Sequence, residues 1–226
     1  MHPVASIPVS WQETVLRLAP QLYLDRIEPF LPIRVGVSVY EESRRSDSFD
    51  RTIQVDSAKV KAVIEYAIYY DYDIQHLYDL EHVWVYVGHE DEIVSVEASF
   101  HGRYFLGVLP DRSNLIEGRG PRLYSQPGKH AMFPRDDLFL LLPNVTSCCT
   151  TEAGDGGVLE PGLFAGEFKS GDNIDQIAEE HLRTFIFEPT FDYVPFDWPE
   201  DAFVSWEELR QEIPVRMKKL IAEIQK

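Results

Sequence analysis

The sequence of 226 residues contains little cysteine and no long apolar run. Its two cysteines, Cys148 and Cys149, are adjacent. Neighbouring Cα atoms lie only ~3.8 Å apart and fit ordinary disulfide geometry poorly, so we expect reduced thiols and a cytoplasmic protein. No apolar run approaches the ~20 residues of a membrane span. The first residues also lack the basic and apolar segments of a secretion signal.

Positive charge is also scarce. Lys and Arg total 21 against 38 Asp and Glu, which gives an acidic protein of formal net charge −17. A field of this sign repels phosphate backbones, and no basic stripe interrupts it, so we expect no nucleic-acid partner. The patterns GxxxxGK[ST], GxGxxG, GxSxG and HExxH are absent, which weighs against several common nucleotide-binding and hydrolytic chemistries.

The residues that are present predict a mainly β fold. With 44% apolar and 12% aromatic residues, the chain can bury a sizeable core, and we expect a single domain over residues 1–226 with its core at about 30–200. Residues 33–40 alternate as a strand does, and residues 83–87 and 93–101 flank the polar GHEDE as a β-hairpin does. Residues 63–70 fit either a helix or a strand, and we favour a strand.

A helix is predicted at the C-terminal end, at about 205–225. Ser205 and Glu208 form a capping box, and an apolar stripe follows at helical spacing. Pro214 falls inside the stripe and should kink or split the helix. The glycine-rich residues 152–175 resemble a long loop. The predicted fold class is an antiparallel β-sandwich with a C-terminal α-helix.

Ionisable residues are concentrated in HLYDLEHVWVYV, residues 76–87. Alternate side chains of a strand share a face, so Asp79 and Glu81 lie on the same face of the strand as Val83. We expect this face to point into the core. Burying an unpaired carboxylate is costly, and a nearby cation would remove that cost. The pattern therefore suggests a metal site. A network of paired surface charges remains the alternative.

Other ionisable side chains could converge on the same end of the sheet. His101 ends a row of the next strand that also carries Glu97, and His130 lies in the Gly/Pro-bounded PGKHAMFP. Asp71 and Asp73 lie just upstream of His76.

Three short segments, in order, resemble known motifs. QHLYDLE (75–81) resembles the heptapeptide G-H-R-H-D-W-E of the necrosis- and ethylene-inducing peptide-like proteins, and DLEH (79–82) resembles the D-W-E-H of a family associated with vacuolar protein sorting. SFHG (99–102) resembles the S-x-H-G of both groups, and GKHAMFP (128–134) the G-S-H-A-x-Y-P of the vacuolar group. The chain departs from the heptapeptide at Gln75, Tyr78 and Leu80.

The resemblance implies a β-sandwich with a divalent cation at one end. The implied ligands are His76, Asp79 and Glu81, with Asp71 (or Asp73) upstream, and His101 corresponds to the S-x-H-G histidine. Carboxylates with water would suit Mg²⁺ or Ca²⁺, whereas two or more imidazoles would suit Zn²⁺, Mn²⁺ or Fe²⁺. Members of the first group are secreted cytolysins, a function that we do not expect of this chain.

Three functions are compatible with these features. The cation could anchor a small polar ligand such as a sugar or a lipid headgroup. It could instead activate water in a hydrolase, with His130 or Glu97 as general base. In the third alternative, the protein is an interaction protein and the cation serves only to stabilise its fold. The ligand, any reaction, the biological pathway and the oligomeric state cannot be read from the sequence.

Overall fold

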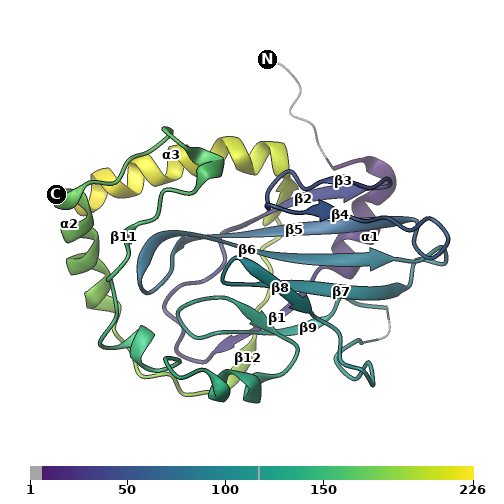
Figure 1. Cartoon of the computed structure of the whole chain (residues 1–226), viewed down its shortest axis with the longest axis horizontal. Coiled ribbons are helices and arrows are strands. Elements are labelled where there is room, and N and C mark those ends of the chain that lie inside the picture. Colours follow the sequence, from purple (N-terminus) through teal and green to yellow (C-terminus); the bar gives the residue numbers. More distant parts are fainter. Residues whose placement is uncertain (1–6, 117) are drawn as a thin grey trace.

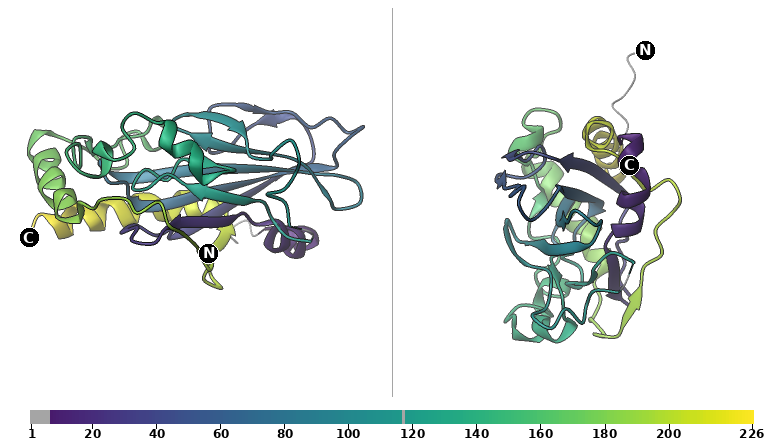
Figure 2. Two further views of the ribbon diagram at one scale, coloured as in Figure 1. Left: turned by 90° about the horizontal axis from the view of Figure 1, so that it is seen from below. Right: turned by 90° about the vertical axis from the view of Figure 1, so that its right-hand side faces the viewer.

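The computed structural model describes residues 7–116 and 118–226, and its core is two β-sheets packed face to face (Figures 1 and 2). The first sheet has the order β10-β9-β1-β12, made of Met132–Phe133, Arg122–Ser125, Gln21–Asp25 and Tyr193–Pro195. The second has the order β13-β2-β5-β6-β7-β8, with β11 paired to β6. Its strands are Phe203–Ser205, Arg34–Tyr40, Ala62–Tyr72, His76–Val87, Ile93–Phe100, Arg103–Leu106 and, for β11, Gly157–Val158.

The predicted hairpin is present as β6 and β7, which pair antiparallel with Val83 opposite Ala98 and Val85 opposite Val96. The pairs β2–β5, β5–β6 and β7–β8 are antiparallel as well. The mainly β, sandwich-like fold with a C-terminal helix is therefore confirmed. Three pairs, β1–β9, β13–β2 and β11–β6, are parallel, which the sequence pattern did not predict.

Strand β5 shows why residues 63–70 have an ambiguous pattern. Its even-numbered side chains, such as Ile64 and Tyr66, pack into the core between the two sheets. Ala67 and Tyr69 pack on the other face, in a second core beneath the C-terminal helix. A strand that is buried on both faces loses the apolar/polar alternation that normally reveals it.

The C-terminal helix, α3, is Trp206–Ile224 and runs along the second sheet (Figure 1). The Ser205 side chain accepts a hydrogen bond from the Glu208 backbone N–H at 3.2 Å, as the capping box predicts. Pro214 does not split the helix. An interior proline costs ~3 kcal/mol. Burial of Leu209, Ile213 and Met217 can offset this cost, because each such side chain contributes about 1.5–3 kcal/mol.

The remaining elements cover the edges of the sandwich. Helix α1, Val9–Leu18, packs its buried side chains into the core between the sheets. Helix α2, Asp172–Leu182, begins inside the stretch predicted as a loop, which also contains β11. A small hairpin, β3 (Arg44–Arg45) with β4 (Thr52–Ile53), forms a separate two-stranded sheet and packs against the second sheet through Ile53. No helix within the described ranges is long and apolar enough to cross a membrane.

Candidate functional site

The candidate site lies where one edge of β6 is unpaired. Strand β7 pairs with β6 only from Val83 onward, and β11 pairs with it only at His76 and Leu77. Residues 78–82 therefore lack a neighbouring strand on this side of the sheet. Tyr78 has a φ of 74°, a left-handed conformation that marks a local irregularity in the strand.

Side chains take over the hydrogen bonds that a neighbouring strand would make. The Leu80 backbone N–H donates to Asp79 Oδ1 at 2.9 Å, and His76 Nδ1 lies 2.9 Å from the Tyr78 carbonyl oxygen, to which it can donate. The His82 N–H donates to Ser99 Oγ at 2.5 Å. Buried backbone groups need such partners. The same contacts fix the orientation of the ionisable side chains at this edge.

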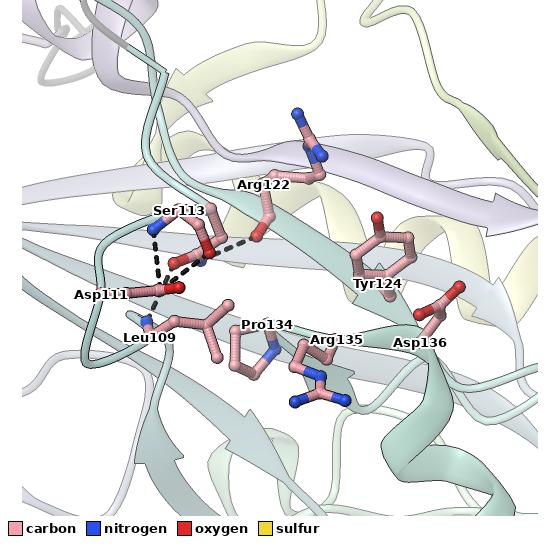
Figure 3. Close-up of a pocket in the computed structure, with 9 residues that line it drawn as sticks. Leu109, Asp111, Ser113, Arg122, Tyr124, Pro134, Arg135 and Asp136 are labelled. Carbon is pink, nitrogen blue, oxygen red and sulfur yellow. Dashed lines mark hydrogen bonds between the residues drawn. The ribbon is translucent and has the colours of Figure 1, made fainter.

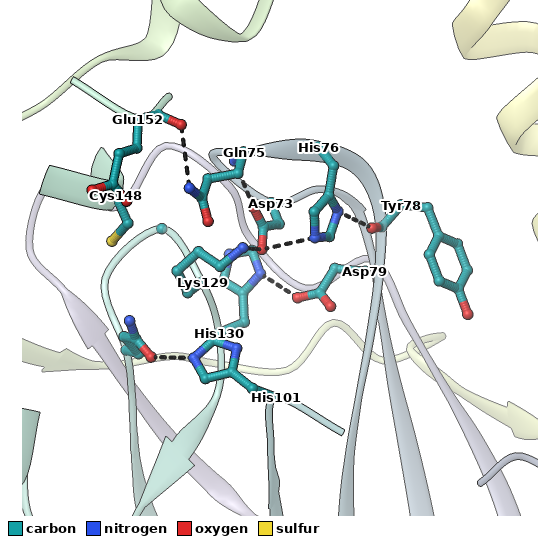
Figure 4. A network of polar contacts seen from close by, with 12 residues as sticks. Asp73, Gln75, His76, Tyr78, Asp79, His101, Lys129, His130, Cys148 and Glu152 are labelled. Atoms are coloured by element: carbon teal, nitrogen blue, oxygen red, sulfur yellow. Dashed lines mark hydrogen bonds and ion pairs between the residues drawn. The ribbon is translucent and has the colours of Figure 1, made fainter. Parts of the chain in front are cut away.

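A pocket of about 340 Å³ opens at this unpaired edge. Four of the five residues predicted as metal ligands line it: His76, Asp79, Glu81 and His101. Asp73, His82 and Lys129 also line it, so the pocket brings carboxylates, imidazoles and one ammonium group together. Figure 4 shows the network of polar contacts around Asp73, His76 and Asp79.

The structure places Asp71 away from this pocket. Its carboxylate forms an ion pair with Arg216 of α3 at 2.8 Å and accepts a hydrogen bond from the Tyr69 hydroxyl. The cause is strand geometry, since Asp71 lies on the α3 face of β5 with Tyr69. After Tyr72 the strand ends and the chain turns back, with the Asp73 N–H donating to the His76 carbonyl. This turn carries Asp73 into the pocket, so Asp73 is the upstream aspartate of the site.

The turn formed by residues 126–131 supplies the positive charge. Lys129 Nζ forms an ion pair with Asp73 Oδ2, and His130 Nδ1 lies 2.9 Å from Asp79 Oδ2 (Figure 4). The buried His130 ring also stacks on Tyr70 at 3.8 Å and lies 3.7 Å from Glu28. Gln126 Oε1 is 2.9 Å from Nε2 of His101. This turn thus contacts three of the ionisable side chains, Asp73, Asp79 and His101, and holds them in place.

Burial and charge oppose each other in this cluster. Burial works against the charge on His130, but the hydrogen bonds and charges of Asp79 and Glu28 outweigh it and raise the pKa of His130 to about 10. Burial and then the charge of Asp79 raise the pKa of Glu81 to about 8. Burial opposes ionisation of Asp73 too, yet His76 and Lys129 hold the Asp73 pKa below its ordinary value.

These side chains do not fit a metal ion as they stand. Within residues 7–116 and 118–226, no three His, Cys, Asp or Glu side chains are placed to hold one ion. The carboxylates have other partners instead. Asp73 contacts Lys129, Asp79 contacts His130, and Glu81 accepts a hydrogen bond from Ser99 Oγ. The predicted ligands are gathered at one pocket, but protein donors surround them.

The two candidate bases, His130 and Glu97, form contacts with other side chains and do not line the pocket. His130 is fully buried between Asp79 and Glu28. Glu97 does not line the pocket, because its side chain forms an ion pair with Arg51 at 2.7 Å and accepts a hydrogen bond from the Tyr86 hydroxyl at 2.8 Å. Neither group is free to take a proton from a water in the pocket.

Sequence reasoning missed Lys129. The signal was available, because Lys129 occupies the position of the Ser in the G-S-H-A-x-Y-P motif that residues 128–134 resemble. A basic residue beside several acids points to charge pairing.

A second pocket, also about 340 Å³, lies near Arg122 and Arg135 (Figure 3) and contains none of the predicted residues.

Fold and site together define a mainly β protein with a charged pocket at an unpaired strand edge. No family model and no curated protein matches the chain. Among solved structures, NLPPya in complex with glucosamine aligns with 20% identity and a TM-score of 0.38, over 57% of this chain and 70% of that one. NLPPya in complex with mannosamine also has 20% identity, with a TM-score of 0.37 and the same coverage.

NLPPya is a necrosis- and ethylene-inducing peptide-like protein, from one of the two groups that the motifs resemble. At TM-scores below 0.4, this likeness carries no function over to the chain. The resemblance to the vacuolar group stays a prediction.

Proposed function

We propose that the pocket at the unpaired edge of β6 binds a small polyhydroxylated ligand, such as a sugar or the sugar of a lipid headgroup. The observation that carries the proposal is the gathering of Asp73, His76, Asp79, Glu81 and Lys129 around one pocket. Ligand pockets of ~300–1,000 Å³ are common, and this one lies near the lower end of that range. Its size suits a single sugar ring better than a polymer.

The mixture of groups favours hydroxyl ligands. Carboxylates accept hydrogen bonds, an ammonium donates them, and histidine can do either, so together they match the alternating donors and acceptors of a sugar. Glu81 is largely protonated at neutral pH, because its pKa is raised to about 8, and Lys129 and His130 balance the charges of Asp73 and Asp79. A neutral ligand is therefore favoured over an anionic one.

Binding is better supported than hydrolysis. A hydrolase needs a base within reach of the attacking water, and His130 and Glu97 are both engaged with other residues. The hypothesis that a divalent cation anchors the ligand stays a prediction, as does that of a purely structural cation. Elemental analysis of the purified protein tests both.

The proposal is tested by calorimetric titration of the protein with glucosamine and with glucose, which measures the affinity for each sugar. Glucosamine is a useful probe because it combines hydroxyls with one ammonium group, and one of the similar structures contains it. Asp79→Asn should weaken binding by about tenfold or more, because a hydrogen bond to a charged group contributes ~1.5–3 kcal/mol.

Asp71→Asn is the matched control. It makes the same chemical change at a residue that the sequence also predicted as a ligand, but whose carboxylate pairs with Arg216 outside the pocket. It should leave the affinity unchanged. The proposal would be wrong if neither sugar binds the wild-type protein, or if both variants lose affinity equally.

A further inference from the structure

Lys129 lies at the point where the sequence led us to expect a metal ion. We infer that the Lys129 ammonium is the resident cation of this pocket, so that the site requires no divalent ion. The inference concerns the same pocket as the proposed function, but its stability test requires no ligand.

The first support is the burial of Lys129. The residue is only 8% exposed, and its Nζ contacts Asp73, which is 2% exposed. Lysine is rarely buried this deeply without a partner, because removing an ammonium from water is costly. The contact with Asp73 compensates both charges. Removing Lys129 leaves the buried Asp73 carboxylate with His76, whose Nε2 lies 3.4 Å away, in place of a fully charged partner.

The second support is that the carboxylates already have donors. Asp73 accepts the Gln75 N–H at 2.5 Å in addition to Lys129. Asp79 accepts the Leu80 N–H at 2.9 Å and contacts His130 at 2.9 Å. A divalent ion bound among these carboxylates would have to displace Lys129 or His130. Either group would then remain buried as an unpaired cation next to the ion.

The third support is that backbone hydrogen bonds fix the turn that carries Lys129. The N–H groups of Lys129 and His130 both donate to the Gln126 carbonyl, at 3.1 and 2.9 Å. The Gly128 N–H donates to Glu28 Oε2 at 2.7 Å, and the Gly128 carbonyl accepts from the Ile74 N–H at 2.8 Å. The backbone of this turn is thus fixed on both sides of the lysine.

If the proposed function holds, Lys129 also contacts the ligand. An ammonium group has three N–H donors. The described residues give Nζ one carboxylate partner, Asp73, and Lys129 lines the pocket. The remaining donors can reach ligand oxygens, which is the task that a metal ion performs in a cation-anchored site.

The test uses thermal unfolding of the wild type, Lys129→Met and Lys129→Arg, each with a chelator and with Mg²⁺, Ca²⁺, Mn²⁺ or Zn²⁺ added singly. The wild type should be insensitive to chelator and metal-free by elemental analysis. Lys129→Met should melt lower and should regain about 5–10 °C at a hundredfold excess of at least one ion over its Kd. Lys129→Arg keeps the charge and should gain nothing from any ion.

Lys59→Met is the matched control, because Lys59 forms an ion pair with Asp56 on the surface and its side chain is 74% exposed. Its melting temperature should not respond to chelator or ions.

The inference is overturned if chelator lowers the melting temperature of the wild type, if the wild type contains stoichiometric metal, or if Lys129→Met folds and no ion raises its melting temperature. If Lys129→Met does not fold, an ion response in Lys129→Arg overturns the inference, and its absence, with a chelator-insensitive wild type, supports it.

Sugar titrations in chelator separate the two proposals. Wild-type affinity that is unchanged by chelator supports both. If no sugar binds but the melting results hold, the ligand proposal fails and the role of Lys129 stands.

Discussion

Glu65 is fully buried and accepts hydrogen bonds from four side chains. They are the hydroxyls of Tyr40, Ser46 and Ser48 and the indole N–H of Trp84, at distances of 2.6 to 3.0 Å. Two of these donors belong to the loop between β3 and β4, and Ser48 of that loop lines the pocket. A single carboxylate therefore fixes one wall of the pocket to the sheet.

Substitution of Glu65 should be costly. Glu65→Gln replaces an oxygen acceptor by an NH₂ group that faces donors, so at least one buried donor loses its partner. We expect the free energy of unfolding to fall by about 2–4 kcal/mol, measured by denaturant titration. Glu90→Gln makes the same change at an exposed glutamate of the β6–β7 turn and should cost less than ~0.5 kcal/mol. Equal losses would contradict this account of Glu65.

His82 should make the protein sensitive to acid. Burial, its largest influence, lowers the pKa of His82 from 6.5 to about 4. The nearby charges of Glu65 and Asp79 act in the opposite direction, and that of Arg51 adds to the lowering. The unfolded chain therefore binds this proton at higher pH than the folded chain. Stability from His82 is present above pH ~6.5 and is lost as the pH falls toward ~4, by up to about 3 kcal/mol.

The measurement compares wild type and His82→Gln between pH ~7 and ~4. The wild type should lose more stability over this interval, since the variant cannot take up the proton. His89→Gln, a change at an exposed histidine, should follow the wild-type curve. Parallel curves for wild type and His82→Gln would show that His82 does not titrate in this way.

The turn at residues 126–131 is the element on which the site depends. Gly128 has a φ of +66°, and a Cβ there would lie 2.8 Å from Ile74 Cγ2 and 3.0 Å from Cys149 Sγ. Both the conformation and the space thus call for glycine. The residue is followed directly by Lys129 and His130, so any shift of the turn displaces the positive charges of the pocket.

Gly128→Ala should lower the free energy of unfolding by about 2–4 kcal/mol and should weaken any ligand binding at the pocket. Gly166→Ala is a matched control, since Gly166 has a φ of +79° but nothing lies within 4 Å of an added Cβ. That control should show only the backbone cost of about 1 kcal/mol and no change in binding. A similar cost for both variants would mean that the contacts with Ile74 and Cys149 do not matter.

Across the whole molecule, the sequence predicts the long elements better than the short ones. Strands β2, β6 and β7 and helix α3 carry clear periodicity, so their positions follow from alternation and from the apolar stripe. Strand β1 pairs in parallel with β9, about a hundred residues away along the chain, and these short strands leave no local pattern. Helix α2 escaped prediction because only Ala178 and Leu182 of its residues are fully buried.

The site was predictable where strand alternation held. Asp79 and Glu81 do end the row of core-facing valines. His76 and His101 also line the pocket, but alternation does not place them there, because Tyr78, with a φ of 74°, interrupts β6 and His101 lies past the end of β7. Asp71, which the resemblance implied, lies within β5 on the α3 face, where it contacts Tyr69 and Arg216. The turn after Tyr72 brings Asp73 to the pocket instead, and a turn cannot be placed from periodicity. The pairing of Lys129 with Asp73 depends on a contact between distant segments, which the sequence alone does not specify.

The unpaired stretch of β6 has a consequence beyond ligand binding. A strand edge with free backbone groups is a template on which a strand of another molecule can add, the usual start of edge-to-edge aggregation. Here the stretch carries Asp79 and Glu81, and the Asp79 side chain occupies the Leu80 N–H that an incoming strand would need. Asp79 and Glu81, which line the pocket, therefore also disfavour the addition of a strand at this edge.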